Sequence, residues 1–139
     1  MSSQRTGRKL AAQFIYQVDM RPIGSQEEEM AMFLATQAGS QGAKLFAQLL
    51  IRGTLFRQAE IDKLITEYSK EWSIDRLNRV DKAILRLGFF ELLSHTPPPV
   101  VINEYIELTK TFSSEDSPKF INGILGGYAK ICLPESSSI

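Results

Sequence analysis

The sequence has few of the residues that most often carry chemistry. Its 139 residues include one cysteine, Cys132, and one histidine, His95, which allow no internal disulfide and too few ligands for a Cys/His zinc site. No apolar run approaches the roughly 20 residues of a membrane span, and the N-terminus lacks the apolar core of a signal peptide. Lys and Arg number 16, as do Asp and Glu, so the net charge of zero gives no global argument for a polyanionic partner. We expect a soluble, cytoplasmic protein without metal or cofactor.

Catalytic motifs are also missing. The sequence has no Gly-x-x-x-x-Gly-Lys-Ser/Thr loop for phosphate, and neither Cys132 nor His95 lies in a recognised nucleophile turn. We expect Cys132 to be an inert core residue and His95 to lie in a loop. Glu104 and Glu107 are one turn apart on a polar face, where solvation explains them. The sequence offers no catalytic constellation, so we do not expect an enzyme.

Apolar residues recur at helical spacing along the whole chain, and no stretch alternates as a half-buried strand does. This pattern predicts an all-α fold. Residues 43–68 are too long for one globular helix, so we expect a bend near Gly53 or Ala59. Almost every position from 81 to 93 is apolar, which predicts a central, buried helix. The expected breaks and caps are residues 21–24, a capping box from Ser25, residues 39–42, residues 97–99, and Ser117 before Pro118.

The length is that of one domain. We expect this domain to span residues 1–133, with lobes at about 1–70 and 71–133, the second beginning near Trp72. Pro134 should end the last helix, leaving residues 134–139 as a disordered tail. Three glycines in that last helix, Gly123, Gly126 and Gly127, are expected to permit close helix packing.

Positive charge gathers on the first helix, because residues 1–18 hold Arg5, Arg8 and Lys9 and no acid. At 100° per residue, Arg5, Lys9, Ala12 and Tyr16 fall together opposite the apolar stripe, with Arg8 at their flank. Cations bind phosphate and an aromatic face can stack on a base, so this face suits a nucleic-acid strand. The alternative is an ordinary solvated helix face.

A second polar face lies on the last helix. Lys119, Asn122, Gly126 and Lys130 point away from the apolar stripe, with Phe120 at its margin. Asparagine can donate and accept hydrogen bonds at a base edge, and single-stranded RNA leaves those edges available. The alternative makes Phe120 a core residue and Asn122 a packing or capping residue.

Three stretches in order resemble the signature of the NusB family of bacterial transcription antitermination factors. They are Val80-Asp81-Lys82-Ala83-Ile84-Leu85-Arg86 with Glu91-Leu92, Ile102-Asn103-Glu104-Tyr105-Ile106-Glu107-Leu108-Thr109-Lys110, and Lys119-Phe120-Ile121-Asn122-Gly123-Ile124-Leu125. Arg8 and the run Ala11-Ala12-Gln13-Phe14-Ile15-Tyr16 also fit. The resemblance extends from about Arg5 to Ile131.

This resemblance implies two small helical bundles packed into one compact domain. It also implies binding of boxA, a single-stranded RNA element, as a heterodimer with the ribosomal protein NusE. That complex joins other Nus factors on elongating RNA polymerase and supports ribosomal RNA transcription. The matching RNA-binding positions are Arg5, Arg8, Lys9, Asp116, Lys119, Phe120 and Asn122, and the NusE-facing positions are Tyr16 and Asp81.

One departure from the family pattern bears on affinity. The N-terminal segment of the family is often richer in arginine, whereas Thr6 and Gly7 stand in the middle of it here. Fewer phosphate contacts predict weak RNA binding that depends on the partner protein. We expect alanine at Arg5, Arg8 and Lys9 to weaken RNA binding without lowering stability. An alternative function is a homodimeric protein–protein scaffold of the Nus complex with little RNA affinity of its own.

Overall fold

The computed structural model describes residues 2–19, 26–70, 74–112 and 116–133. Within these residues the chain forms helices and no strand, as predicted. The helices are α1 (Ser3–Val18), α2 (Gln26–Thr36), α3 (Gln41–Phe56), α4 (Gln58–Tyr68), the short 3₁₀ helix η1 (Ile74–Arg76), α5 (Arg79–Leu93), α6 (Pro98–Phe112) and α7 (Ser117–Cys132). The all-α prediction is confirmed. None of these helices is long and apolar enough to cross a membrane.

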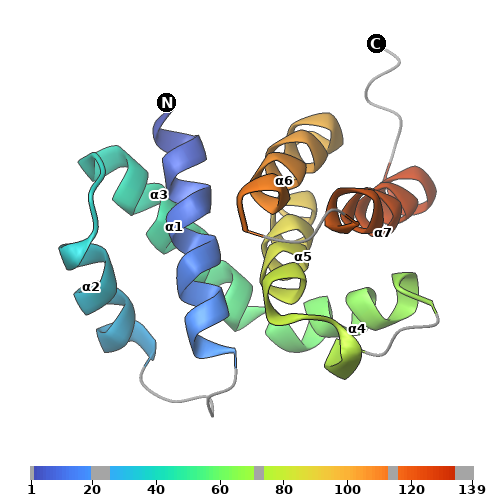
Figure 1. The fold of residues 1–139 in the computed structure, drawn as a ribbon, viewed down its shortest axis with the longest axis horizontal. Helices are drawn as coiled ribbons and strands as arrows, with labels where there is room; N and C mark the ends of the chain where they lie inside the picture. The colour runs from blue at the N-terminus through green and yellow to red at the C-terminus, as the bar shows by residue number, and fades with distance from the viewer. Residues whose placement is uncertain (1, 20–25, 71–73, 113–115, 134–139) are drawn as a thin grey trace.

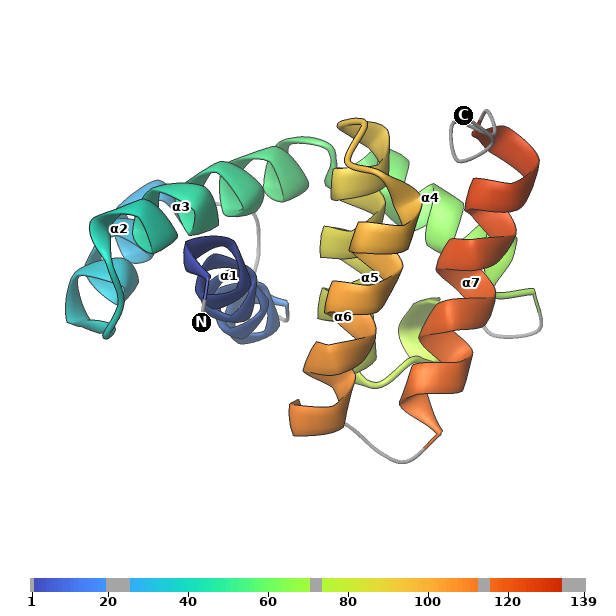
Figure 2. The ribbon, with the colours of Figure 1, turned by 90° about the horizontal axis from the view of Figure 1, so that it is seen from above.

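The helices form two bundles, which are separated in both views of the ribbon (Figures 1 and 2). In the first, α1 packs along α3 and α2 lies beside them. In the second, α6 packs along α7, and α4 contacts both α5 and α7. Arg57 lies between α3, which packs on α1, and α4, which packs on α5 and α7. Helix α5 contacts α1 and α3 as well as its own bundle, so it joins the two.

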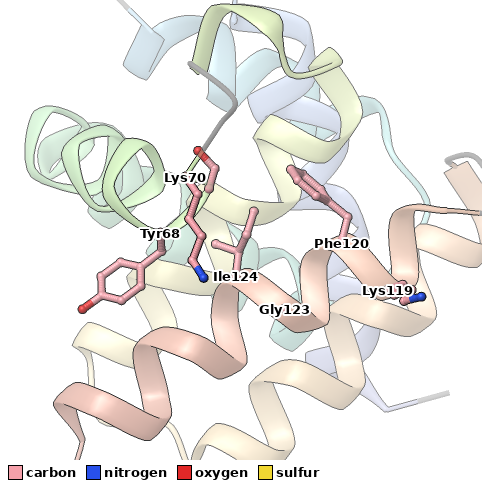
Figure 3. Close-up of a pocket in the computed structure, with 7 residues that line it drawn as sticks. Tyr68, Lys70, Lys119, Phe120, Gly123 and Ile124 are labelled. Atoms are coloured by element: carbon pink, nitrogen blue, oxygen red, sulfur yellow. The ribbon is translucent and has the colours of Figure 1, made fainter.

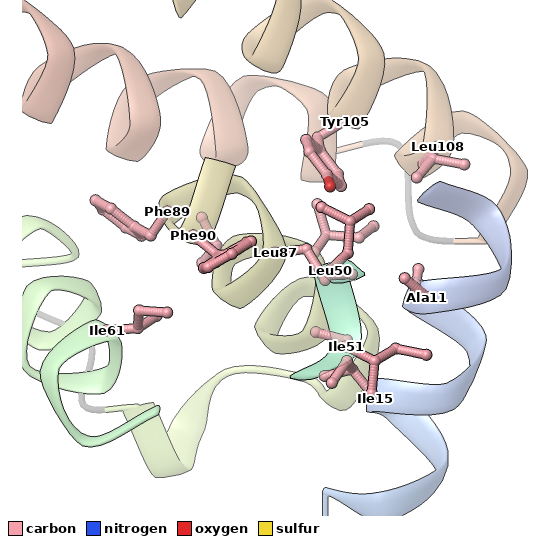
Figure 4. Packing of buried hydrophobic residues seen from close by; sticks show 14 of the residues in the cluster. Ala11, Ile15, Leu50, Ile51, Ile61, Leu87, Phe89, Phe90, Tyr105 and Leu108 are labelled. Atoms are coloured by element: carbon pink, nitrogen blue, oxygen red, sulfur yellow. The ribbon is translucent and has the colours of Figure 1, made fainter. Parts of the chain in front are cut away.

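Helix α5 is central because nearly all of its sides are apolar. Asn78 caps its start, where the side-chain oxygen accepts a hydrogen bond from the Asp81 backbone N–H at 2.8 Å. Every residue from 83 to 92 is buried. Figure 4 shows Leu87 and Phe90 of this helix among side chains from both bundles, including Leu50 of α3. The predicted central helix is confirmed.

The predicted bend in residues 43–68 is a break at Arg57. Helix α3 ends at Phe56, and α4 begins at Gln58. Arg57 has non-helical backbone angles (φ −101°, ψ 16°), yet its N–H donates to the Gly53 carbonyl at 3.0 Å. The break therefore lies between Gly53 and Ala59, the two positions named from the sequence.

Three glycines outside the last helix permit close packing. A Cβ at Gly7 would lie 2.8 Å from the carbonyl oxygen of Ala43, so α1 approaches α3 with no room for a side chain. A Cβ at Gly53 would overlap the Phe90 ring. Gly88 faces Leu125 of α7 in the same way, at 2.8 Å. Gly7 therefore has a packing role in addition to interrupting the basic segment.

The expectation of close packing at Gly123, Gly126 and Gly127 is wrong. A Cβ at Gly123 or Gly127 would meet nothing within 4 Å. A Cβ at Gly126 would meet only the side-chain oxygen of Asn122, at 3.8 Å. These glycines lie on the open side of α7, so they leave a smooth helix surface instead of admitting a neighbouring helix.

Other local predictions have mixed outcomes. His95 lies in an exposed turn after α5, as expected, with a positive φ of 72°. Cys132 is exposed rather than part of the core, and its sulfur lies 3.1 Å from the Tyr68 hydroxyl. The N-cap of α7 is Asp116, one residue before the predicted Ser117. The predictions that fall outside the described residues are the break at 21–24, the capping box from Ser25, the lobe start near Trp72 and the tail at 134–139.

A cluster of charges joins the end of α1 to α4 and α5. The Arg86 guanidinium donates to Asp62 of α4 at 2.8 and 2.9 Å and to Asp19, which follows α1, at 2.5 Å. Lys82 adds a contact to Asp19 at 3.3 Å. Burial lowers the pKa of Arg86, but its hydrogen bonds to Asp62 and Asp19 and their charges outweigh burial and raise it. Arg86 therefore remains charged and holds the two bundles in register.

Candidate nucleic-acid interface

The N-terminal half of α1 carries the three predicted cations. The Ser2 hydroxyl caps the helix by accepting a hydrogen bond from the Arg5 backbone N–H at 3.0 Å. Arg5, Arg8 and Lys9 then follow at intervals of three and four residues, which places them on neighbouring positions of one helix side. Their surroundings differ strongly, because Arg8 faces Glu91 of α5 and Arg5 faces Glu104 of α6.

Arg8 is an interior residue and not a flank of an exposed row. Only 4% of it is exposed, and its Nε and Nη2 donate to the two carboxylate oxygens of Glu91 at 2.7 and 2.8 Å. The Tyr105 hydroxyl donates to the same carboxylate at 2.6 Å. The Arg8 guanidinium also lies over the Phe46 ring, 5.3 Å from its centre. The expectation of an exposed Arg8 is therefore wrong, and its paired guanidinium fixes α1 against α5.

Burial and pairing shift the pKa values in this cluster. Burial lowers the pKa of Arg8, but the hydrogen bonds and charge of Glu91 outweigh burial and raise it above its ordinary value. Burial raises the pKa of Tyr105 well above its ordinary value, and the charge of Glu91 raises it further. Arg8 thus stays protonated as a cation, and Tyr105 stays a neutral hydrogen-bond donor to Glu91.

Arg5 is the exposed cation, and it too faces a carboxylate. Its Nε and Nη2 donate to the two oxygens of Glu104 on α6 at 3.1 and 2.8 Å. The Arg5 side chain is 48% exposed and that of Glu104 19%. The hydrogen bond from Arg5 lowers the pKa of Glu104. The prediction that Glu104 is a freely solvated surface carboxylate is therefore wrong. Glu107, in contrast, is exposed and pairs with Lys110 on its own helix.

Lys9 and Tyr16 complete the side of α1 that the sequence singled out. Lys9 is half-buried and has no acidic partner within 4 Å in the part of the chain that the structure describes. Ala12, expected on the exposed face, is buried. Tyr16 is 40% exposed, and the Arg79 guanidinium stacks 4.4 Å from its ring centre while donating to its backbone carbonyl at 2.8 Å. The second half of the predicted row is therefore an aromatic–cation pair.

The start of α7 carries the second group of predicted residues. Asp116, Lys119 and Asn122 are exposed, and for Lys119 and Asn122 this exposure was expected from their helical spacing. Phe120 is half-buried and packs against the core. Asp116 is the N-cap but makes no side-chain capping hydrogen bond. These polar groups are therefore presented to solvent around a partly exposed aromatic ring.

Phe120 lies between two hollows in the surface. The larger, of about 340 Å³, is drawn in Figure 3 and lies between the end of α4 and the first turns of α7. It is lined by Tyr68, Ser69, Lys70, Lys119, Phe120, Gly123 and Ile124. The second, of about 290 Å³, is lined by Arg76, Leu77, Asn78, Asp81, Asp116, Ser117 and Phe120. The bare surface at Gly123 contributes to the first hollow, so this glycine shapes the site.

Asp81 connects the start of α5 to the start of α7. It is 7% exposed, and its Oδ2 accepts hydrogen bonds from Ser117 Oγ at 3.1 Å and Asn78 Nδ2 at 3.2 Å. Asp81 is one of the residues that line the second hollow. The two predicted partner-facing residues therefore differ: Tyr16 is exposed on α1, and Asp81 is a buried support of α7.

Spacing along the chain could not reveal several residues of this surface. Tyr68 is the last residue of α4 and Lys70 follows two residues later, about 50 residues before α7, and no motif marks them. Glu91 and Glu104 were present in the recognised stretches, but only the fold pairs them with the N-terminal arginines. Among the described residues there is no cluster of three or more His, Cys, Asp and Glu side chains that could hold a metal ion.

The chain is similar to known proteins over nearly its whole length. The NusB family model matches residues 5–130. Transcription antitermination protein NusB of Geobacter sulfurreducens is 45% identical over 138 residues, covering 97% of this chain and 99% of the relative. The structure of T. maritima NusB superposes with a TM-score of 0.82 at 33% identity, covering 97% of this chain and 96% of that one. A crystal structure of antitermination factors NusB and NusE in complex with dsRNA gives 0.80 at 29% identity, covering 94% and 98%. The chain belongs to the NusB family.

Proposed function

We propose that this protein is a transcription antitermination factor that binds boxA RNA together with the ribosomal protein NusE. In this proposal the complex joins other Nus factors on elongating RNA polymerase in the bacterial cytoplasm and supports ribosomal RNA transcription. The observation that carries it is the half-buried Phe120, which lines two hollows, with Lys70 and Lys119 also lining the first. Family membership supports it, as does the similarity to a structure solved with NusE and double-stranded RNA.

The RNA surface that we propose combines two kinds of contact. Arg5 and Lys9 on α1 and Lys119 on α7 bind phosphates, because lysine and arginine supply the electrostatic part of RNA affinity. Phe120 offers an aromatic face to a base, and Asn122 offers donors and acceptors to a base edge. Asp116 accepts hydrogen bonds from amino groups of the RNA at the opening of the second hollow.

Arg8 and Asp81 act through other residues in this proposal. Arg8 is held by Glu91 and fixes the direction of α1, and Asp81 holds the first turn of α7 through Ser117. We assign the NusE contact to Tyr16 and the Arg79 stacked on it, because both side chains are accessible next to the start of α5. Aromatic and arginine side chains are enriched at the centres of protein interfaces.

A homodimeric scaffold is the second candidate function, and one observation favours it. Leu45, Leu49 and Phe56 lie along the outer side of α3 and are 54%, 57% and 90% exposed. Exposed apolar side chains at helical spacing are typical of protein interaction surfaces.

The test is a titration of fluorescently labelled boxA RNA, and of a scrambled RNA of equal length, with the chain alone and with its NusE complex. Because this surface has few cations to contact phosphates, we expect weak binding by the chain alone and tighter, boxA-selective binding by the complex. Equal affinity for the two RNAs in the presence of NusE would contradict the proposal. Sedimentation at several concentrations distinguishes the scaffold, which predicts a dimer that RNA does not dissociate.

A further inference from the structure

The Arg5–Glu104 pair joins the RNA-binding side of α1 to α6. Two parallel hydrogen bonds of 3.1 and 2.8 Å occupy the Nε–Nη2 edge of the guanidinium. This is the edge with which arginine also binds a phosphate, because the same fork geometry fits both anions. One guanidinium edge cannot make both bidentate pairs at once. A phosphate that approaches Arg5 by this edge must therefore displace Glu104.

We propose that Glu104 competes with RNA phosphate for Arg5 and so limits the RNA affinity of this protein, an inference that rests on the proposed RNA-binding function. The exposure of the two pairs explains why the competition takes place at Arg5. The Arg8–Glu91 pair has side chains that are 4% and 3% exposed, so RNA cannot reach it. The Arg5 side chain is 48% exposed, and a phosphate can approach it from solvent.

The charges around α1 support this competition. Glu104 is also 3.8 Å from Nη1 of Arg8, so it faces both arginines. The positive charges of Arg5 and Arg8 are balanced by the negative charges of Glu91 and Glu104. Of the three cations that α1 carries, Lys9 alone has no acidic partner within 4 Å among the described residues. The N-terminal helix is basic in sequence but close to neutral on its surface.

Phosphate displaces Glu104 by exchange, and protonation is not required. The hydrogen bond from Arg5 lowers the pKa of Glu104, so its carboxylate is charged at neutral pH. When RNA binds, Arg5 exchanges one anion for another and Glu104 is released to solvent. The structure thus relates the weak RNA binding expected from the sequence to a specific carboxylate on α6.

The variant that tests this is Glu104→Gln, which keeps the size of the side chain and removes its charge. Binding of fluorescein-labelled boxA RNA is measured by anisotropy with the full chain in its NusE complex. An exposed ion pair contributes up to about 1 kcal/mol, so we expect about two- to fivefold tighter binding. The site also gains one net positive charge, which should steepen the slope of log K against log salt by up to about 0.7.

Glu107→Gln is the matched control. It removes the same charge from the same helix one turn away, where Glu107 pairs with Lys110 and acts on Arg5 only through its charge. We expect a smaller gain than for Glu104→Gln. Equal gains in the two variants would overturn the proposal, because they would show a general charge effect rather than competition for Arg5.

A double-mutant cycle separates this inference from the proposed function. Arg5→Ala should weaken RNA binding, and adding Glu104→Gln to it should restore little, because no guanidinium remains to be released. If Arg5→Ala weakens binding but Glu104→Gln does not tighten it, the competition is disproved and the RNA site stands. If the wild-type complex does not prefer boxA and Arg5→Ala changes nothing, the proposed function fails and the competition with it.

Discussion

Replacing Arg8 with alanine should lower the free energy of unfolding by about 3–5 kcal/mol, the usual result of removing one partner from a buried ion pair. Arg8 is 4% exposed, and it makes two of the hydrogen bonds that the Glu91 carboxylate accepts. Without it, the carboxylate keeps the Tyr105 hydroxyl at 2.6 Å and the Thr96 hydroxyl at 3.4 Å, and these neutral donors are too weak to compensate a buried negative charge. Urea denaturation followed by far-ultraviolet circular dichroism measures the loss.

Arg5→Ala is the control for Arg8→Ala. Arg5 makes a similar bidentate pair, but its side chain is 48% exposed, so its loss should cost no more than about 1 kcal/mol. Adding Glu91→Gln to Arg8→Ala should recover part of the stability, because no unpaired buried charge then remains. If Arg8→Ala lowers the free energy of unfolding as little as Arg5→Ala, Arg8 does not hold the bundles together.

The sequence predicted that alanine at Arg5, Arg8 and Lys9 would not lower stability. Because Arg8 is buried and paired, we now expect this of Arg5 and Lys9 only.

Replacing Leu85 with alanine should cost about 2–5 kcal/mol through the cavity that it leaves in α5. Leu85 is fully buried in the helix that contacts both bundles, so its neighbours have little freedom to collapse into the space. Leu45→Ala is the matched control, because Leu45 is 54% exposed and its truncation opens no cavity. A single cooperative transition in both variants would support the prediction that residues 1–133 form one domain, and two transitions would contradict it. A loss below about 1 kcal/mol for Leu85→Ala would show that α5 is not tightly packed.

The helices were predictable because local patterns determine them. The apolar sides of α5 follow from the spacing of apolar residues along the chain. The break near Arg57 follows from the length of the helical pattern over residues 43–68. The place of Arg8 does not follow from spacing, because its partner Glu91 is 83 residues away. On α1 alone, a cation three residues after Arg5 belongs to an exposed polar side. Only the packing of α1 against α5 converts that position into an interior one.

The glycines show the same limit. Gly88 and Gly127 both stand within helical patterns, and nothing local distinguishes them. Gly88 faces Leu125 at close range, whereas Gly127 faces open space. At the candidate site, the exposed positions of Lys119 and Asn122 were predicted correctly because they depend only on the periodicity of α7. Lys70 was missed because it approaches α7 only in the folded chain.

If RNA lies along the start of α1 and the start of α7, the ¹H–¹⁵N spectrum of the labelled chain in its NusE complex should show this during addition of boxA RNA. We expect the amide signals of residues 5–9 and 116–123 to move most, while those on the outer side of α3, at Leu45, Leu49 and Phe56, remain in place. Shifts confined to the outer side of α3, or unchanged signals at the starts of α1 and α7, would contradict this expectation.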